Sequence, residues 1–335
     1  VKEDDVKDEI RVDDIGLTLT IQHSLNYHAQ RKELSFKNNG YVTFENDQTR
    51  WESDMTRKTH AHEQHIYNFS GQYAVDSLST VQFGFDGYNA PSNNGHYKIP
   101  TNIYSTVTNE IQSNYLTSNQ KNQFNNSFNS YLVFDKKFGN NDLTWTNNFS
   151  TKKFKEDQEI ATLLNFADQA ETNNRFANYN IQNISLYSSQ LDYRFSNDKL
   201  TVESGLKYSF VKNQNDLNFF DGTSGKLILD LSKSNFFNYK ENIFAAYVSS
   251  EYKWKKWGMK GGLRSETTII KTNSDNPAVE NQTTRTGIFP TFYLMYNLKD
   301  DQQIGFSYGK RIDRPNYDFL NPSKSYYNLY SYFQG

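Results

Sequence analysis

The segment 191–210 decides the fold, and its sequence is LDYRFSNDKLTVESGLKYSF. Apolar residues alternate with polar ones on either side of a polar centre at 196–199, whose Ser, Asn and Asp are typical of turns. After that centre, Leu200 and Leu206 lie on one side of the alternation and Glu203 lies on the other. A period of two marks a strand whose two faces meet different surroundings. The segment therefore predicts a long β-hairpin with one apolar face and one polar face.

The same pattern recurs along the chain and predicts six hairpins, with turns near positions 31, 77, 139, 197, 255 and 300. Each hairpin is expected to hold two strands of roughly 10 to 13 residues. The intervals between the hairpins are polar and are expected to be long loops, at 46–64, 90–121, 155–177, 212–240 and 268–287. Short turns at one end of the strands and long loops at the other are typical of outer-membrane β-barrels.

The composition fits a β-barrel and excludes several other classes. The 335 residues include 16% aromatics, no Cys, and 36 Lys and Arg against 38 Asp and Glu. No apolar run approaches the ~18 to 20 residues of a membrane-spanning helix, whereas barrel strands alternate and keep the average polar. Without Cys there are no disulfides and no Cys-ligated metals. Without a basic patch, nucleic acid is not an expected partner.

Aromatic residues gather near the ends of the expected strands, as at Tyr193, Phe195, Trp254 and Trp257. Such a girdle forms where a barrel meets the membrane interfaces. We therefore predict an all-β protein, a transmembrane antiparallel up-and-down β-barrel in the outer membrane of a Gram-negative bacterium, in contact with membrane lipid. A soluble all-β solenoid or propeller is the alternative.

Motifs in the last part of the chain resemble a known family. The segments 288–292 and 303–317, with the Leu-Asn-Pro that follows, are similar to the barrel of TonB-dependent receptors of the Bacteroidota type. The positions that match the family's fold motif one by one are Arg311, Arg314, Pro315, Leu320, Asn321 and Pro322. Because Pro315 has no N–H to donate to a strand ladder, we expect it at a strand end or a bulge.

The resemblance implies a barrel of 22 strands around a plug domain, with TonB supplying energy for the uptake of a ligand. The whole chain, 1–335, is then one barrel segment of about 12 strands, with a thirteenth expected from Tyr327. The plug and the terminal strands are expected elsewhere in a longer protein. A surface lipoprotein or a larger outer-membrane complex is a further expected partner. Two other functions stay open, a structural or accessory barrel subunit and a passive porin.

Charged residues on the polar register of the strands are expected to face the lumen. There, opposite charges on neighbouring strands can pair and hold a plug by polar contacts. This wall and plug interface is preferred to a substrate site. The residues are Asp192, Arg194, Glu203, Lys207, Lys260, Arg264 and Glu266.

Ligand contacts are expected from aromatic and polar residues of the long loops, namely Trp51, His65, Tyr88, Tyr97, Tyr104, Tyr115, Phe219 and Phe220. His60, His62 and His65 form the one dense group of metal-ligand type. On a strand His60 and His62 would share a face, as in transition-metal sites, although a polar loop without metal is the preferred interpretation. No nucleophile, phosphate-binding or zinc-protease motif occurs. The chain is thus expected to be no enzyme and to need no cofactor.

Overall fold

The computed structural model describes residues 3–12, 17–28, 33–44, 47–59, 62–166, 172–276, 278–299, 301–314, 320–322, 324–326 and 332–333. Within these ranges the regular structure is β-strand, and no helix is long and apolar enough to cross a membrane. The strands are β1 (Glu3–Val12), β2 (Leu17–His28), β3 (Glu33–Phe44), β4 (Asp47–Thr59), β5 (His62–Asp76), β6 (Ser79–Ser105), β7 (Ile111–Phe138), β8 (Asn141–Phe166), β9 (Thr172–Ser196), β10 (Leu200–Asp221), β11 (Ile228–Leu229), β12 (Asn235–Trp254), β13 (Trp257–Asp275), β14 (Ala278–Lys299), β15 (Gln302–Gly309), β16 (Ser325–Tyr326) and β17 (Tyr332–Phe333).

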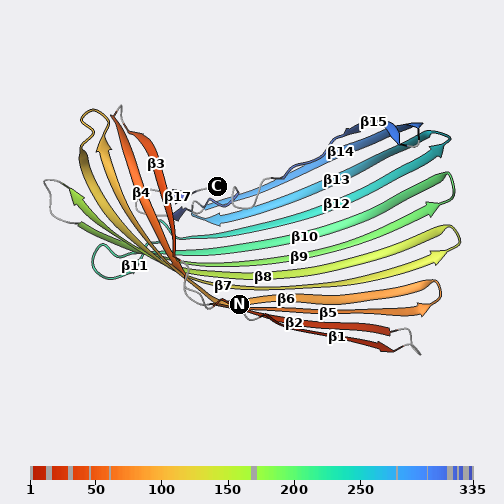
Figure 1. Cartoon of the computed structure of the whole chain (residues 1–335), viewed down its shortest axis with the longest axis horizontal. Coiled ribbons are helices and arrows are strands. Elements are labelled where there is room, and N and C mark those ends of the chain that lie inside the picture. Colours follow the sequence, from red (N-terminus) through yellow and green to blue (C-terminus); the bar gives the residue numbers. More distant parts are fainter. Residues whose placement is uncertain are drawn as a thin grey trace.

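One antiparallel sheet contains all of these strands except the small β16–β17 pair. Its main path runs β1-β2-β5-β6-β7-β8-β9-β10-β12-β13-β14-β15, while β3 and β4 join through β6, and β11 joins through β10. Figure 1 shows a broad, strongly curved sheet whose long strands lie side by side. The expected all-β antiparallel up-and-down architecture is confirmed. Among the described residues, however, the sheet stays open, with β1 and β15 at the two ends of its main path. The expected total of 22 strands stays a prediction.

Five of the six predicted hairpins are confirmed, and they are β5–β6, β7–β8, β9–β10, β12–β13 and β14–β15. The first is wrong, because β2 pairs with β1 and β5, and β3 pairs with β4. The acidic segment that forms β1 was not predicted as a strand, because its alternation consists of Val6, Ile10 and Val12 alone. Its ladder to β2 comes from backbone hydrogen bonds, which charged sequences can also make. The thirteenth strand expected from Tyr327 begins at a position outside the described residues.

The five intervals predicted to be long loops are mostly strand, so that prediction is wrong. β6, β7 and β8 have 27, 28 and 26 residues, which corresponds to about 80 to 90 Å at ~3.3 Å per residue. A membrane needs only ~9 to 11 residues of a tilted strand. The strands thus continue far beyond the membrane. Period-two alternation did not reveal these extensions, because polar residues are interspersed among the apolar ones on both of their faces.

β6 changes partners halfway along its length. Its first half pairs with β5, from Ser79 to Asn89, and its second half pairs with β4, from Gly95 to Ser105. A register shift against β7 falls between Ala90 and Asn93, around Pro91. Proline cannot donate to a ladder and is found at bulges, which bend a strand and increase its twist. The β3–β4 hairpin therefore diverges from β1, β2 and β5 beyond this point (Figure 1).

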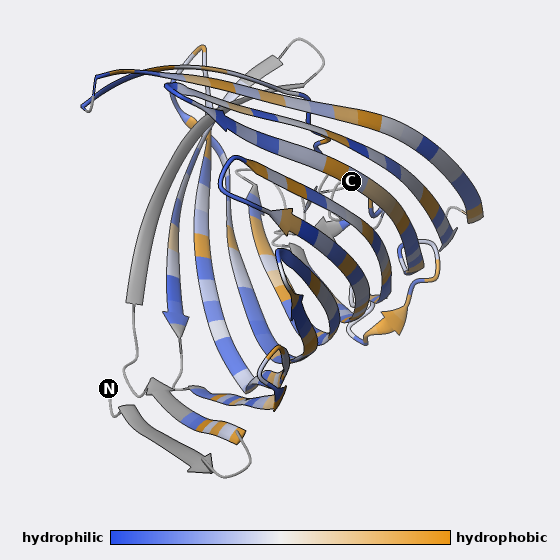
Figure 2. Ribbon diagram, turned by 90° about the vertical axis from the view of Figure 1, so that its right-hand side faces the viewer, coloured by the Kyte–Doolittle hydropathy of each residue, from blue (hydrophilic) through white to orange (hydrophobic). Residues whose placement is uncertain are grey.

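The sheet has an outer and an inner face. Near the short turns the outer face carries exposed apolar side chains. Figure 2 shows hydrophobic and hydrophilic residues alternating along the strands. The aromatics of the outer face at this end include Tyr193, Trp254 and Trp257, with the Trp257 ring 4.5 Å from that of Tyr296. We call this zone the apolar band, and its outward residues include Phe85, Phe128, Leu132, Trp145, Phe149, Leu191, Leu206, Phe244, Val248, Leu263, Phe292, Ile304 and Phe306.

Candidate functional site

The inner face is the candidate site, and the register of the strands defines it. Arg194 lies directly opposite Glu203 across β9 and β10, with 3.8 Å between Nε and Oε1. Lys260 lies opposite Glu251 across β12 and β13, and Arg264 lies opposite Tyr247. The prediction that seven charged residues of these strands share one face is therefore confirmed. They are Asp192, Arg194, Glu203, Lys207, Lys260, Arg264 and Glu266.

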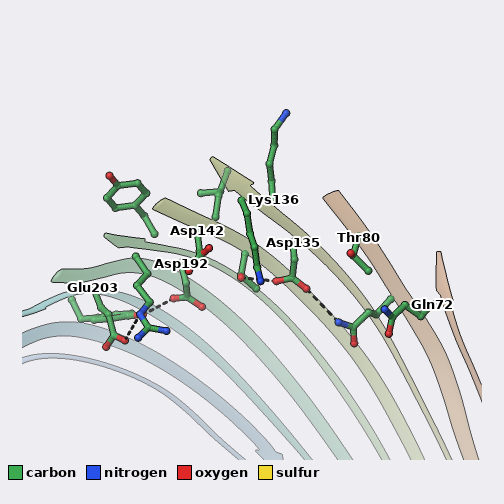
Figure 3. A pocket seen from close by; sticks show the side chains of 14 residues that line it. Gln72, Thr80, Asp135, Lys136, Asp142, Asp192 and Glu203 are labelled. Carbon is green, nitrogen blue, oxygen red and sulfur yellow. Dashed lines mark hydrogen bonds and ion pairs between the residues drawn. The ribbon is translucent and has the colours of Figure 1, made fainter. Parts of the chain in front are cut away.

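A cavity of about 640 Å³ lies on this face at the short-turn end. Figure 3 shows Asp135, Asp142, Asp192 and Glu203, which come from β7, β8, β9 and β10 and line the cavity together with Arg194. Lys136 and Lys137 line the cavity as well, so four carboxylates face two ammonium groups and one guanidinium. The wall therefore carries charges of both signs, with a slight excess of negative charge. Such a surface favours a partner whose own charges and hydrogen-bonding groups are complementary to it.

Hydrogen bonds hold the carboxylates of the cavity in place. Asp192 accepts one from the Tyr247 hydroxyl at 2.6 Å and one from the Gln190 amide at 2.8 Å. Asp135 accepts one from the Thr144 hydroxyl at 2.6 Å. Side chains fixed by such bonds can meet a partner without losing further conformational freedom. The wall is therefore preorganised as a contact surface.

A second group of charges lies further along the inner face, where Arg314 crosses over β12 and β13. Arg314 forms ion pairs with Glu266 and, at 3.6 Å, with Glu241. Arg264 pairs with Glu266 at 2.8 Å. Both glutamates are buried, with 7% of Glu241 and 5% of Glu266 exposed. Two guanidinium groups thus compensate two buried carboxylates, as burial of charge requires.

The motif that suggested the resemblance lies against this face. β15 ends at Gly309, and the amide of Asn321 donates to Asn215 of β10 at 3.4 Å. Leu320 and Pro322 are half-buried, whereas Arg311 is exposed. Pro315 lies outside the described residues. The motif therefore anchors the segment after β15 to the inner wall, mainly through Arg314 and Asn321.

The eight residues predicted to contact a ligand from loops lie on strands, and their placement in loops is wrong. Four share the inner face of β4, β6, β7 and β10, namely Trp51, Tyr97, Tyr115 and Phe219. Trp51 meets Tyr115 edge to face at 5.9 Å, and Arg57 lies 5.5 Å from the Tyr97 ring. Tyr88 also follows the inner register, while the outward side chains are His65, Tyr104 and Phe220.

The histidine group lies only partly within the described residues. His60 lies outside the described residues, and nothing is described of the His62 side chain. His65 stacks on His23 at 5.9 Å on the outer face and lies 3.8 Å from Glu63. No group of three or more metal-ligating side chains occurs in the described part of the chain.

Buried polar rows in the extended half of the inner face were not found from the sequence. The Gln158 amide donates to Asn119 at 3.2 Å, and Asn178 donates to Gln158 at 3.3 Å. The hydroxyls of Thr117 and Thr162 lie 3.2 Å apart. Beside these rows Ile160, Phe176 and Phe219 form an apolar core. Asn119 is an even number of residues from Asp135, and Asn178 is an even number from Asp192, so the alternation along each strand places both on the inner face. This signal was available in the sequence.

The open antiparallel sheet, its apolar outward band and its charged inward wall define an outer-membrane β-barrel protein. A sequence model described as Outer membrane protein beta-barrel family matches residues 134–335, which is more than half of the chain. The chain belongs to that family. Its location is accordingly the outer membrane, where its strands meet lipid. No curated protein matches the sequence.

Proposed function

We propose that this chain forms part of the barrel wall of a TonB-dependent receptor that takes up a ligand across the outer membrane. The charged, hydrogen-bonded cavity on the inner face carries this proposal. Twelve strands of the main path already form an open arc, and barrels of more than ~16 strands enclose either a channel or a plugged lumen. The wall around Asp135, Asp192 and Glu203 offers fixed acceptors to which a plug domain can bind.

In this proposal the protein is not an enzyme. The short turns face the periplasm and the long strand extensions face the extracellular side, which is the usual orientation of outer-membrane barrels. The resemblance of 288–322 to the receptor barrel supports it. Trp51, Tyr97 and Tyr115, on the inner face of the extensions, are the first residues we assign to ligand contact.

The test starts with the native protein extracted from outer membranes and analysed by intact mass and peptide mapping. A plug and a TonB-contacting segment in the same polypeptide are expected, with near-zero conductance after reconstitution. Neutralising the cavity wall by Asp135→Asn, Asp192→Asn and Glu203→Gln should raise the conductance. The matched control changes Asp157 and Glu159 to their amides, on the outer face of β8. An open conductance in the unmodified protein would instead identify a passive porin, and a silent barrel without a plug would identify an accessory subunit.

A further inference from the structure

Three lysines lie side by side on the outer face, where no other observation explains them. Lys212 of β10 is directly opposite Lys240 of β12, which is directly opposite Lys271 of β13. Side chains at directly opposed positions have Cβ atoms only ~4.5 to 5.5 Å apart, and like charges placed in this way destabilise a sheet. No ion pair joins any of the three to a carboxylate within the described residues. The row is thus a concentrated, uncompensated positive charge.

The row lies immediately beyond the apolar band. Lys212 is the first outward position after Phe210, and Lys271 is the first after Ile269. On β10 the outward positions from Leu200 to Phe210 span 11 residues. A strand of ~9 to 11 residues, tilted by about 45°, crosses the hydrocarbon core. The lysines are therefore at the height of lipid headgroups, at the membrane boundary away from the short turns.

A groove of about 480 Å³ lies on the same outer face within the apolar band. Small residues at Ala246 and Ser265 form its floor, and larger ones at Leu191, Leu206 and Phe244 form its sides. Half or more of the Leu206 and Phe244 side chains is exposed, at 62% and 50%. A surface of this kind in a membrane accommodates an acyl chain.

The groove and the lysine row are aligned on the same three strands. Tyr208, Phe244 and Thr267 line the groove, and each is four residues from the lysine of its own strand. In all three strands the lysine is the one further from the short turns. Four residues correspond to about 13 Å along a strand, the length of an extended acyl segment of roughly ten carbons. One lipid can therefore place a chain in the groove and its phosphate at the lysines.

We propose that Lys212, Lys240 and Lys271 bind the phosphorylated headgroup of a glycolipid of the outer leaflet, with one acyl chain in the groove beneath them. The nearest outward carboxylate on β14 is Glu280, opposite Asn273 and two residues beyond the lysine row. This carboxylate is not opposite any of the three lysines, so the row itself keeps its positive charge. The choice of leaflet rests on the orientation given in the proposed function, whereas lipid binding does not depend on transport.

The experiment uses the full native protein in detergent and monophosphoryl lipid A as the probe, with bound lipid measured by native mass spectrometry. The variant changes Lys212, Lys240 and Lys271 to Gln, and the matched control changes Lys199, Lys255 and Lys299, which lie at the short turns, to Gln. Each lysine near an anionic surface strengthens binding by roughly tenfold or less. We therefore expect the variant to bind lipid A about 10- to 100-fold more weakly than the unmodified protein, and the control to bind it equally well.

A second variant, Ala246→Phe, fills the groove on an exposed face and leaves the lysines intact. It should weaken binding of lipid A and leave binding of inorganic phosphate unchanged. Equal binding by the lysine variant and the unmodified protein would overturn the proposal. So would equal binding of dephosphorylated lipid A. Competition by millimolar inorganic phosphate as effective as that by the lipid would show a free-anion site rather than a lipid site.

Discussion

Removal of Arg314 tests whether the segment after β15 is held by the buried charges of the inner wall. Breaking a buried ion pair by removing one partner costs about 3 to 5 kcal/mol, because the other charge stays buried. Here 37% of the Arg314 side chain is exposed and Arg264 still pairs with Glu266. We therefore expect Arg314→Ala to lower the free energy of unfolding by about 2 kcal/mol, most of it from the unpaired carboxylate of Glu241.

The assay is a urea titration of the protein reconstituted in vesicles, combined with limited proteolysis of the segment after β15. Arg311→Ala is the control, because Arg311 belongs to the same motif and is exposed, but no ion pair joins it to a carboxylate among the described residues. Surface changes of this kind stay within about 0.5 kcal/mol. The double variant with Glu241→Gln should recover part of the loss, since the uncompensated charge is then removed. Equal stabilities of the Arg314 and Arg311 variants would refute the reasoning.

Three further predictions follow from the packing and the hydrogen bonds. Gly205→Ala should destabilise by about 1 to 3 kcal/mol in the same urea titration, because a Cβ there would collide with Asp192 and with the Tyr247 ring at 2.5 Å; Gly261→Ala, with nothing within 4 Å of its Cβ, is the neutral control. Ile160→Ala should cost about 2 to 4 kcal/mol, since Ile160 is fully buried in the core beside Phe176 and Phe219, whereas Val107→Ala, at 89% exposure, should be silent. The Ser232 hydroxyl donates to Asp230 at 2.6 Å and lowers the pKa of that carboxyl below its ordinary value of 3.8. The ionised Asp230 therefore stabilises segment 222–234 fully at neutral pH, and this stabilisation is lost as the pH falls below 3.8 through the lowered pKa. Proteolysis of this segment should increase on acidification, and less steeply in Asp230→Asn, while a pH-independent rate would contradict this.

The long strand extensions change where a ligand would be recognised. Residues such as Tyr97 and Tyr115 lie on rigid strands rather than on loop tips. Sites built on strands hold their side chains more precisely than sites on loops. The rows of bonded Asn, Gln and Thr around Asn119 and Thr117 strengthen that wall from inside. A ligand site on the extensions would therefore be largely preformed.

The sequence by itself determined the strand class, most of the turns and the two faces of the membrane part. Alternation around Leu206 and Glu203 is enough for this, because each side chain's face follows from its parity within one strand. It also determined that Arg194, Arg264 and Glu266 share the inner face. These are local properties of each strand, and they do not depend on which strands are its neighbours.

The tertiary structure decided which strands are neighbours and where distant residues meet. The pairing of β2 with β1 and β5 and the contact of Arg314 with Glu241 have no local pattern in the sequence. The row formed by Lys212, Lys240 and Lys271 likewise exists only because the register across β10, β12 and β13 aligns them. Register depends on backbone hydrogen bonds over the whole length of two strands. Where polar residues are interspersed on both faces, as in the extensions, no regular hydrophobic alternation predicts the strand.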